Sequence, residues 1–284
     1  MNSFPNPQPS WNVVADFRTL LQYPFMVEAF RAGLIVSVLA AVVGWFMVLR
    51  RQSFAGHTLA LVGFPGATAA VLLGFSATYG FFVFSGVAAV VIALLPTAGR
   101  SGRGRETAVV GTVQAFALAF GFLCYSLYGG FATAIDSLLF GSFLGITSPQ
   151  VVALAAVALL ALATLALIGR PLFFATVDPD VALANGVPVR ALATTYLIVL
   201  GLTAGAVSQV TGALLVFALL VAPAAAAQRL SVRPLTSLSW SIGLSMLIVV
   251  LGLSLSYFYP YPLGTFVTSL ALLFYVGARV VGRR

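Results

Sequence analysis

Few side chains in this sequence could do chemistry. Its 284 residues include one histidine, His57, one cysteine, Cys124, and six acidic residues. Neutral imidazole is a common ligand for zinc and other transition metals, so His57 is the candidate metal ligand. A lone histidine close to Arg51 also fits a polar surface or hydrogen-bonding role. The sequence leaves both interpretations open.

Other ligand atoms are scarce. Cys124 lies in an apolar run and has no second cysteine with which to form an internal disulfide. Glu28 and Asp136 are expected at the ends of apolar segments, where solvent or an arginine partner satisfies a carboxylate. Because the sequence contains no lysine, it has no G-x-x-x-x-G-K-[ST] loop for nucleotide phosphates. We expect no catalytic residues and no cofactor bound by this chain.

The composition indicates an integral membrane protein, because 61% of the residues are hydrophobic and 7% are charged. Soluble domains carry about 25% charged residues. We predict an all-α, polytopic fold with a polar tail at 1–23 and a single transmembrane domain at 24–284. About nine spanning helices are expected, within a range of about eight to ten. The expected spans are 28–49, 59–75, 81–95, 108–127, 151–168, 192–207, 213–227, 238–257 and 263–276.

One further apolar segment, at 135–146, is too short to cross a membrane. Its 12 residues form a helix of only about 18 Å, whereas the hydrocarbon core is about 30 Å thick. We therefore expect a re-entrant or tilted element at this position.

The distribution of arginine predicts the orientation of the chain. All 14 basic residues are arginine, and most lie at the ends of apolar segments. Because positive residues mark the cytoplasmic side, nine crossings place the amino terminus outside and the carboxyl terminus in the cytoplasm. The net charge of +8 is thus explained by topology, and no nucleic acid partner is expected.

Two of the expected spans contain helix-breaking residues. Gly63, Pro65 and Gly66 fall within the second span, whereas Gly212 opens a later one and Pro223 interrupts it. Proline removes a backbone donor, and broken helices in transporters commonly lie beside the substrate path. We predict that these residues line a translocation path, with tolerated packing kinks as the alternative.

A polar segment at 171–190 separates two apolar spans. Asp178 is a plausible helix cap, Asp180 would lie in the first turn, and Gly186 can end a short helix over 182–185 in a left-handed conformation. So short a helix is unstable by itself in water, which favours docking on a cytoplasmic protein. An ordinary connecting loop is the alternative.

Several stretches together resemble the permease subunit of zinc and manganese ABC importers, found in the bacterial cytoplasmic membrane. They occur in the family's order and cover most of the chain from about residue 24 to 280. The resemblance implies a homodimer embedded in membrane lipid, with two cytoplasmic ATP-binding subunits and an extracytoplasmic solute-binding protein. The matching stretches are 50–56, Pro65-Gly66, 138–147, 178–188, 212–216 and 222–225.

For the polar segment, the resemblance implies a coupling helix that sits in a groove of the ATPase. ATP and Mg²⁺ are then bound by the partner, and closure of the ATPase dimer moves the permease by alternating access. This chain is accordingly not an enzyme. The positions that match the coupling helix are Asp178, Asp180, Ala182, Ala184 and Gly186.

The sequence departs from the family at its metal ligands. After the Arg-Arg-x-Ser-Phe-x-Gly stretch, the family typically has an aspartate and, four residues later, a histidine, taken to contact metal. Here these positions are His57 and Leu61. The cargo is therefore either a divalent metal, such as zinc or manganese, or a metal chelate or non-metal solute. An ATPase-independent secondary transporter is disfavoured, because such carriers usually place ionisable residues within the bilayer and this chain has hardly any there. A scaffold without transport activity is a further alternative.

Overall fold

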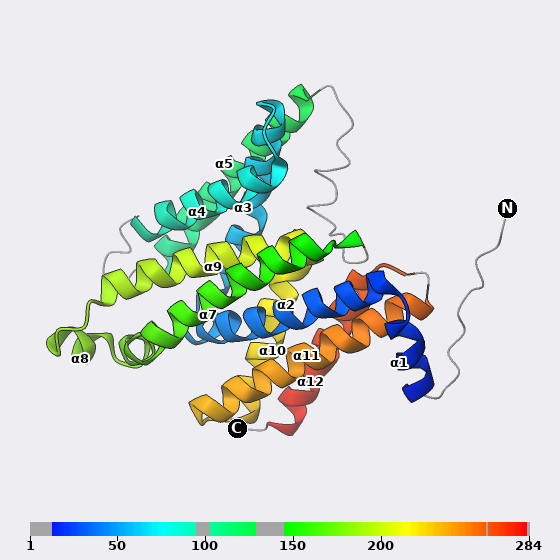
Figure 1. Cartoon of the computed structure of the whole chain (residues 1–284). Helices are drawn as coiled ribbons and strands as arrows, with labels where there is room; N and C mark the ends of the chain where they lie inside the picture. Colours follow the sequence, from blue (N-terminus) through cyan, green and yellow to red (C-terminus); the bar gives the residue numbers. More distant parts are fainter. Residues whose placement is uncertain (1–12, 95–102, 129–144, 260, 283–284) are drawn as a thin grey trace.

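The computed structural model describes residues 13–94, 103–128, 145–259 and 261–282, and within these ranges every regular element is a helix (Figure 1). The all-α prediction is confirmed. The helices are α1 (Val13–Leu21), α2 (Pro24–Leu49), α3 (Ser53–Leu72), α4 (Ala77–Leu94), α5 (Arg103–Leu127), α7 (Ser148–Val177), α8 (Pro179–Ala184), α9 (Val189–Thr211), α10 (Ala213–Leu230), α11 (Pro234–Phe258) and α12 (Leu263–Val281).

Eight of these helices are long and apolar enough to cross a membrane: α2, α3, α4, α5, α7, α9, α11 and α12. In α10, the apolar part at Leu215–Leu230 is shorter. Each of the nine expected spans thus corresponds to a helix, and the predicted polytopic fold is confirmed. The segment predicted to be re-entrant, 135–146, lies outside the described residues except for positions 145 and 146. Asp136 also lies outside them.

Two elements extend beyond the ranges that the sequence predicted. Helix α7 continues through Pro171 to Val177, so the first third of the polar segment is helical. In the predicted polar tail, α1 packs against α2 and α11. Leu20 is buried, and the Phe17 and Phe30 rings lie with their centroids 5.5 Å apart. The part of the tail nearest the bundle is therefore anchored to it by apolar contacts.

Helix α2 forms the centre of the bundle, in contact with α7, α9, α10 and α11. Gly44 permits its closest approach to α10, because a Cβ at this position would overlap the Leu220 carbonyl. The buried Tyr196 hydroxyl of α9 donates to the Val43 carbonyl at 2.9 Å. Small residues and side-chain hydrogen bonds of this kind hold helices together where lipid is as apolar as leucine.

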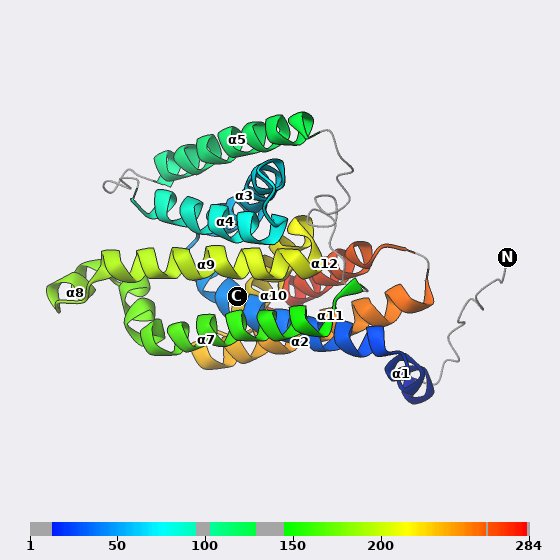
Figure 2. The same cartoon turned by 45° about the horizontal axis from the view of Figure 1, so that its top comes forward.

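Helices α3, α4 and α5 form a second layer beside this bundle. Helix α3 contacts both α4 and α5, while α9 contacts α3 and α4 on one side and α7 on the other (Figure 2). Both views place α8 and α1 at opposite ends of the molecule. The end that carries α8 also includes the turn between α2 and α3, and this proximity positions the candidate site.

Candidate functional site

Helix α8 is capped at both ends by its own residues. Asp178 is its N-cap, with Oδ1 accepting from the Val181 backbone N–H at 3.1 Å, and Asp180 lies in its first turn. At the other end Gly186 has a φ of 76°. The backbone N–H of Val187 donates to the Ala182 carbonyl and that of Gly186 to the Leu183 carbonyl, both at 3.0 Å. This is a Schellman arrangement, so both predicted caps are confirmed, although the helix begins at Pro179 instead of Ala182.

Most of the surface of α8 is exposed, including two apolar side chains. Val181 and Leu183 are 46% and 56% exposed, whereas Ala182 is fully buried. Asp178, Asp180, Ala184 and Gly186 are all exposed. Of the five predicted coupling positions, four are available at the surface, and Ala182 instead anchors α8 to the bundle.

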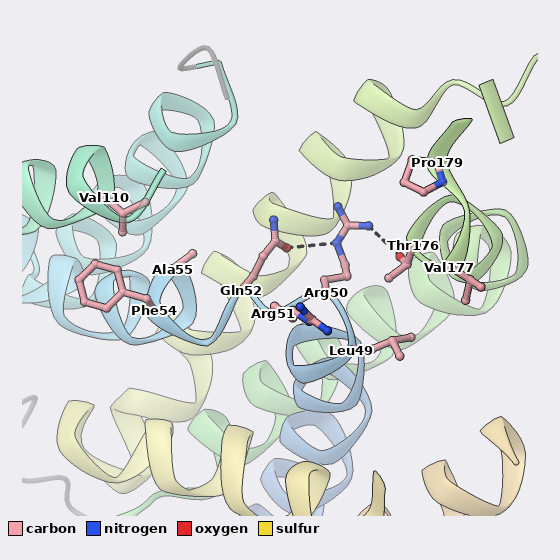
Figure 3. Close-up of a pocket in the computed structure, with 10 residues that line it drawn as sticks. All are labelled: Leu49, Arg50, Arg51, Gln52, Phe54, Ala55, Val110, Thr176, Val177 and Pro179. Carbon is pink, nitrogen blue, oxygen red and sulfur yellow. Dashed lines mark hydrogen bonds between the residues drawn. The ribbon is translucent and has the colours of Figure 1, made fainter. Parts of the chain in front are cut away.

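A pocket of about 530 Å³ lies beside the start of α8 (Figure 3). It is bordered by the turn between α2 and α3, by Val110 of α5 and by the end of α7. Within it Arg50 Nη1 donates to Thr176 Oγ1 at 3.0 Å and Nε donates to Gln52 Oε1 at 3.1 Å. The turn between α2 and α3 passes through Arg51, whose φ is 58°.

Arg50 also lies over the ring of Tyr196, with its guanidinium carbon 5.4 Å from the ring centroid. One side chain thus connects the α2–α3 turn with α7 and α9. The sequence indicated Arg50 through its resemblance to the family, but no local pattern related it to Thr176 or Tyr196, which follow more than a hundred residues later. This junction therefore places the last turn of α7 in direct contact with the turn that leads into α3.

His57 lies near the start of α3, half-buried, with its ring in edge contact with Phe217 of α10 at a centroid distance of 4.9 Å. Its Nδ1 is buried and has no hydrogen-bond partner among the described residues. Across the same part of the chain, no three His, Cys, Asp or Glu side chains lie close enough to hold a metal together. In the part of the chain that the structure describes, His57 thus belongs to no cluster of three such side chains, and one of its ring nitrogens has no hydrogen-bond partner.

The glycines predicted for the translocation path make close helix contacts. A Cβ on Gly63 would overlap the Phe81 ring, and one on Gly66 would overlap the Gly80 carbonyl. Pro65 faces α5, since a Cβ on Gly121 would lie 2.9 Å from the Pro65 Cα. Helix α3 runs through Pro65 without interruption, so the predicted break in this span is wrong. Packing against α4 and α5 holds the helix together despite the missing donor.

The later span differs, because Gly212 ends one helix and begins the next. It is the C-cap of α9 and the N-cap of α10, with φ 82° and ψ 146°. Helix α10 then continues through Pro223. The predicted opening of this span at Gly212 is therefore confirmed, and the predicted interruption at Pro223 is wrong. Neither outcome tests whether these residues line a path.

The fold and the exposed, capped α8 define a polytopic helical membrane protein with a short exposed helix at one end. The model described as "ABC 3 transport family" matches residues 22–282, so the chain belongs to that family. It is a membrane permease component of an ABC transporter, a subunit that is not itself catalytic.

The chain is similar to two curated transport proteins along most of its length. With the manganese transport system membrane protein MntC of Halalkalibacterium halodurans it shares 26% identity over 261 residues, 92% of this chain and 88% of that protein. With the high-affinity zinc uptake system membrane protein ZnuB of Haemophilus influenzae it shares 25% identity over 237 residues, 84% of this chain and 90% of that protein.

The fold is also similar to a chain in the solved structure of PsaBC from Streptococcus pneumoniae in complex with Fab. The TM-score is 0.81, with 22% identity, covering 94% of this chain and 95% of that chain. At this identity the likeness concerns the fold alone.

Proposed function

We propose that this chain is the permease subunit of an importer for manganese, zinc or a related divalent metal, driven by ATP hydrolysis on a separate subunit. The observation that carries the proposal is α8, which is capped at both ends and exposed along most of its surface. A helix of six residues gains little stability alone, so its exposed Val181 and Leu183 favour a protein partner. Family membership and the names of the relatives support an ATPase as that partner and a metal as cargo.

In this mechanism, ATPase subunits carrying ATP and Mg²⁺ hold α8 through Asp178, Asp180, Ala184 and Gly186. Closure of the ATPase dimer displaces α8 together with the adjoining ends of α7 and α9. Thr176, in the last turn of α7, passes this displacement to Arg50 and so to the start of α3. Alternating access follows if α3 and its neighbours move relative to the second copy of the chain.

His57 is the proposed metal contact. A buried imidazole nitrogen without a hydrogen-bond partner is available to a metal when the ring is neutral. One imidazole binds weakly, which suits a path that must release its ion. A homodimer would bring two copies of His57 to the path, and this second copy compensates for the ligand that Leu61 does not provide.

The proposed setting is a bacterial cytoplasmic membrane, with the amino terminus outside and the carboxyl terminus inside. Arginines at helix ends support this orientation, including Arg50, Arg190 and Arg279 at the ends of α2, α9 and α12. An extracytoplasmic solute-binding protein would deliver the metal to the opposite end of the bundle.

The proposal can be tested by metal uptake into proteoliposomes that contain the permease, its ATPase and its binding protein. We expect ATP-dependent accumulation of zinc or manganese that is lost in His57→Ala while ATP hydrolysis is retained. Cys124→Ala is the matched control, because it removes a buried thiol that the proposed metal contact does not use and should leave uptake unchanged. An assembled, ATP-hydrolysing complex that accumulates no free divalent ion would contradict the metal cargo and point to a chelate.

A further inference from the structure

A second cavity, of about 540 Å³, opens between α2, α7 and α11 on the outside of the bundle. Eleven of its twelve lining residues carry no charge, and the remaining one is Arg170. Its size lies within the range of small-molecule sites, about 300–1,000 Å³. We call this cavity the α2–α7–α11 groove.

One end of the groove lies at the level expected for lipid headgroups, and the rest lies along the apolar part of the span. Arg170 is 22 residues beyond Ser148, the start of α7, which corresponds to about 33 Å along a helix and slightly exceeds a core of about 30 Å. Trp45 lies in the last turns of α2, and α11 begins at Pro234, another lining residue. The charged end of the groove is therefore at the interface, at the end of the bundle that carries α8.

The walls of the groove are held in place by contacts between the helices. Trp45 Nε1 donates to Ser237 Oγ of α11 at 3.0 Å. The Trp45 ring also stacks on Phe173 of α7, with centroids 6.1 Å apart and planes at 16°. Gly169 leaves space in the groove, because a Cβ at this position would already be in van der Waals contact with the Phe46 ring at 3.6 Å and a larger side chain would fill the space.

In the single chain the groove is open to the surroundings of the bundle, because Ala166 and Arg170 on its α7 wall are exposed and Leu235 on its α11 wall is 81% exposed. Among the described residues Arg170 takes part in none of the ion pairs. An arginine at the headgroup level attracts an anionic lipid by about 1 kcal/mol. The first turn of α11 adds the positive end of a helix dipole at Pro234 and Leu235.

We propose that the α2–α7–α11 groove is a binding site for an anionic glycerophospholipid, with one acyl chain along the apolar wall and the phosphate at Arg170. The site depends on the membrane location of the chain and not on what is transported. A lipid bound in the groove would contact α2, α7 and α11 together at the end of the bundle where α7 leads to α8. A zwitterionic phospholipid fits the apolar wall but gains less from Arg170.

The test measures lipid retained by the full-length permease in detergent, using native mass spectrometry with phosphatidylglycerol and phosphatidylcholine. We expect preferential retention of phosphatidylglycerol and a loss of about fivefold in its affinity in Arg170→Gln, the factor that corresponds to one interfacial arginine. Gly169→Leu should reduce retention of both lipids by filling the groove. Arg279→Gln, which removes an exposed arginine in the last turn of α12, is the matched control and should retain both lipids normally.

Two outcomes would overturn the proposal. The first is that the unaltered protein, Arg170→Gln and Gly169→Leu all retain phosphatidylglycerol equally. Thermal unfolding must show that both variants are folded. The other is that a second copy covers the groove. Ala166→Cys in a Cys124→Ala background places a thiol on the exposed groove wall, and disulfide-linked dimers in native membranes would assign the groove to the protein interface.

Discussion

Arg50 and Thr176 are joined by a hydrogen bond across 126 residues of sequence, with Nη1 donating to Oγ1 at 3.0 Å. Arg50 is the C-cap of α2, and Thr176 lies two residues before Asp178, the N-cap of α8. The bond therefore connects the base of α8 to the turn that leads into α3. Under the proposed function, it lies on a route from the ATPase contact at α8 to α3, the helix that carries His57.

Removing this bond should uncouple ATP hydrolysis from transport. For Thr176→Val we expect the metal transported per ATP hydrolysed to fall about threefold, the factor equivalent to an average side-chain hydrogen bond in a membrane protein. Thr164→Val is the matched control, because Thr164 lies on the same helix and its hydroxyl bonds only the Leu160 carbonyl, at 2.8 Å. Uptake and phosphate release measured together give the ratio. A normal ratio in Thr176→Val would remove this bond from the mechanism.

Gly186→Ala should weaken binding of the ATPase without disturbing the bundle. Nothing lies within 4 Å of a Cβ at this position, so the cost is the left-handed backbone, φ 76°, which disfavours a non-glycine residue by about 1–2 kcal/mol. We expect the affinity of the permease for its ATPase to fall at least about fivefold. Gly243→Ala, equally open but within α11, should bind normally. Equal affinities for the two variants would mean that α8 is not the docking element.

Gly66→Leu should destabilise the protein instead of acting only on transport. Its side chain would collide with the Gly80 carbonyl and the Phe84 Cβ, and overpacking of this kind costs about 1–3 kcal/mol or more. We expect a lower unfolding temperature in detergent and reduced uptake. Gly86→Leu, on α4 with open space around it, should unfold at the normal temperature. If Gly66→Leu has normal stability and only its uptake is lost, a path role for Gly66 gains support.

Gly212→Ala tests the junction between α9 and α10. The backbone at φ 82° and ψ 146° is a region that glycine occupies almost alone, so alanine should cost about 1–3 kcal/mol. We expect a lower unfolding temperature and lower uptake, whereas Gly277→Ala, in open space on α12, should unfold at the normal temperature. Unchanged stability in Gly212→Ala would indicate that the junction rearranges easily.

The sequence by itself determined the features that depend on local bonds and on composition. Long apolar segments must form helices in a membrane, because every backbone amide needs an internal partner there, and the expected spans correspond to helices. The caps of α8 were also predictable, since Asp178 and Gly186 act on backbone groups only a few residues away.

The tertiary structure decided which faces of the helices meet. In these uniformly apolar helices no polar stripe marks the buried side, because lipid is as apolar as the protein core. The sequence therefore could not relate Arg50 to Thr176, or place Trp45, Phe173 and Arg170 around one groove. Pro65 shows a related limit: local propensity predicts a break, but α3 continues through Pro65 and packs against α4 and α5, contacts that no local pattern reveals.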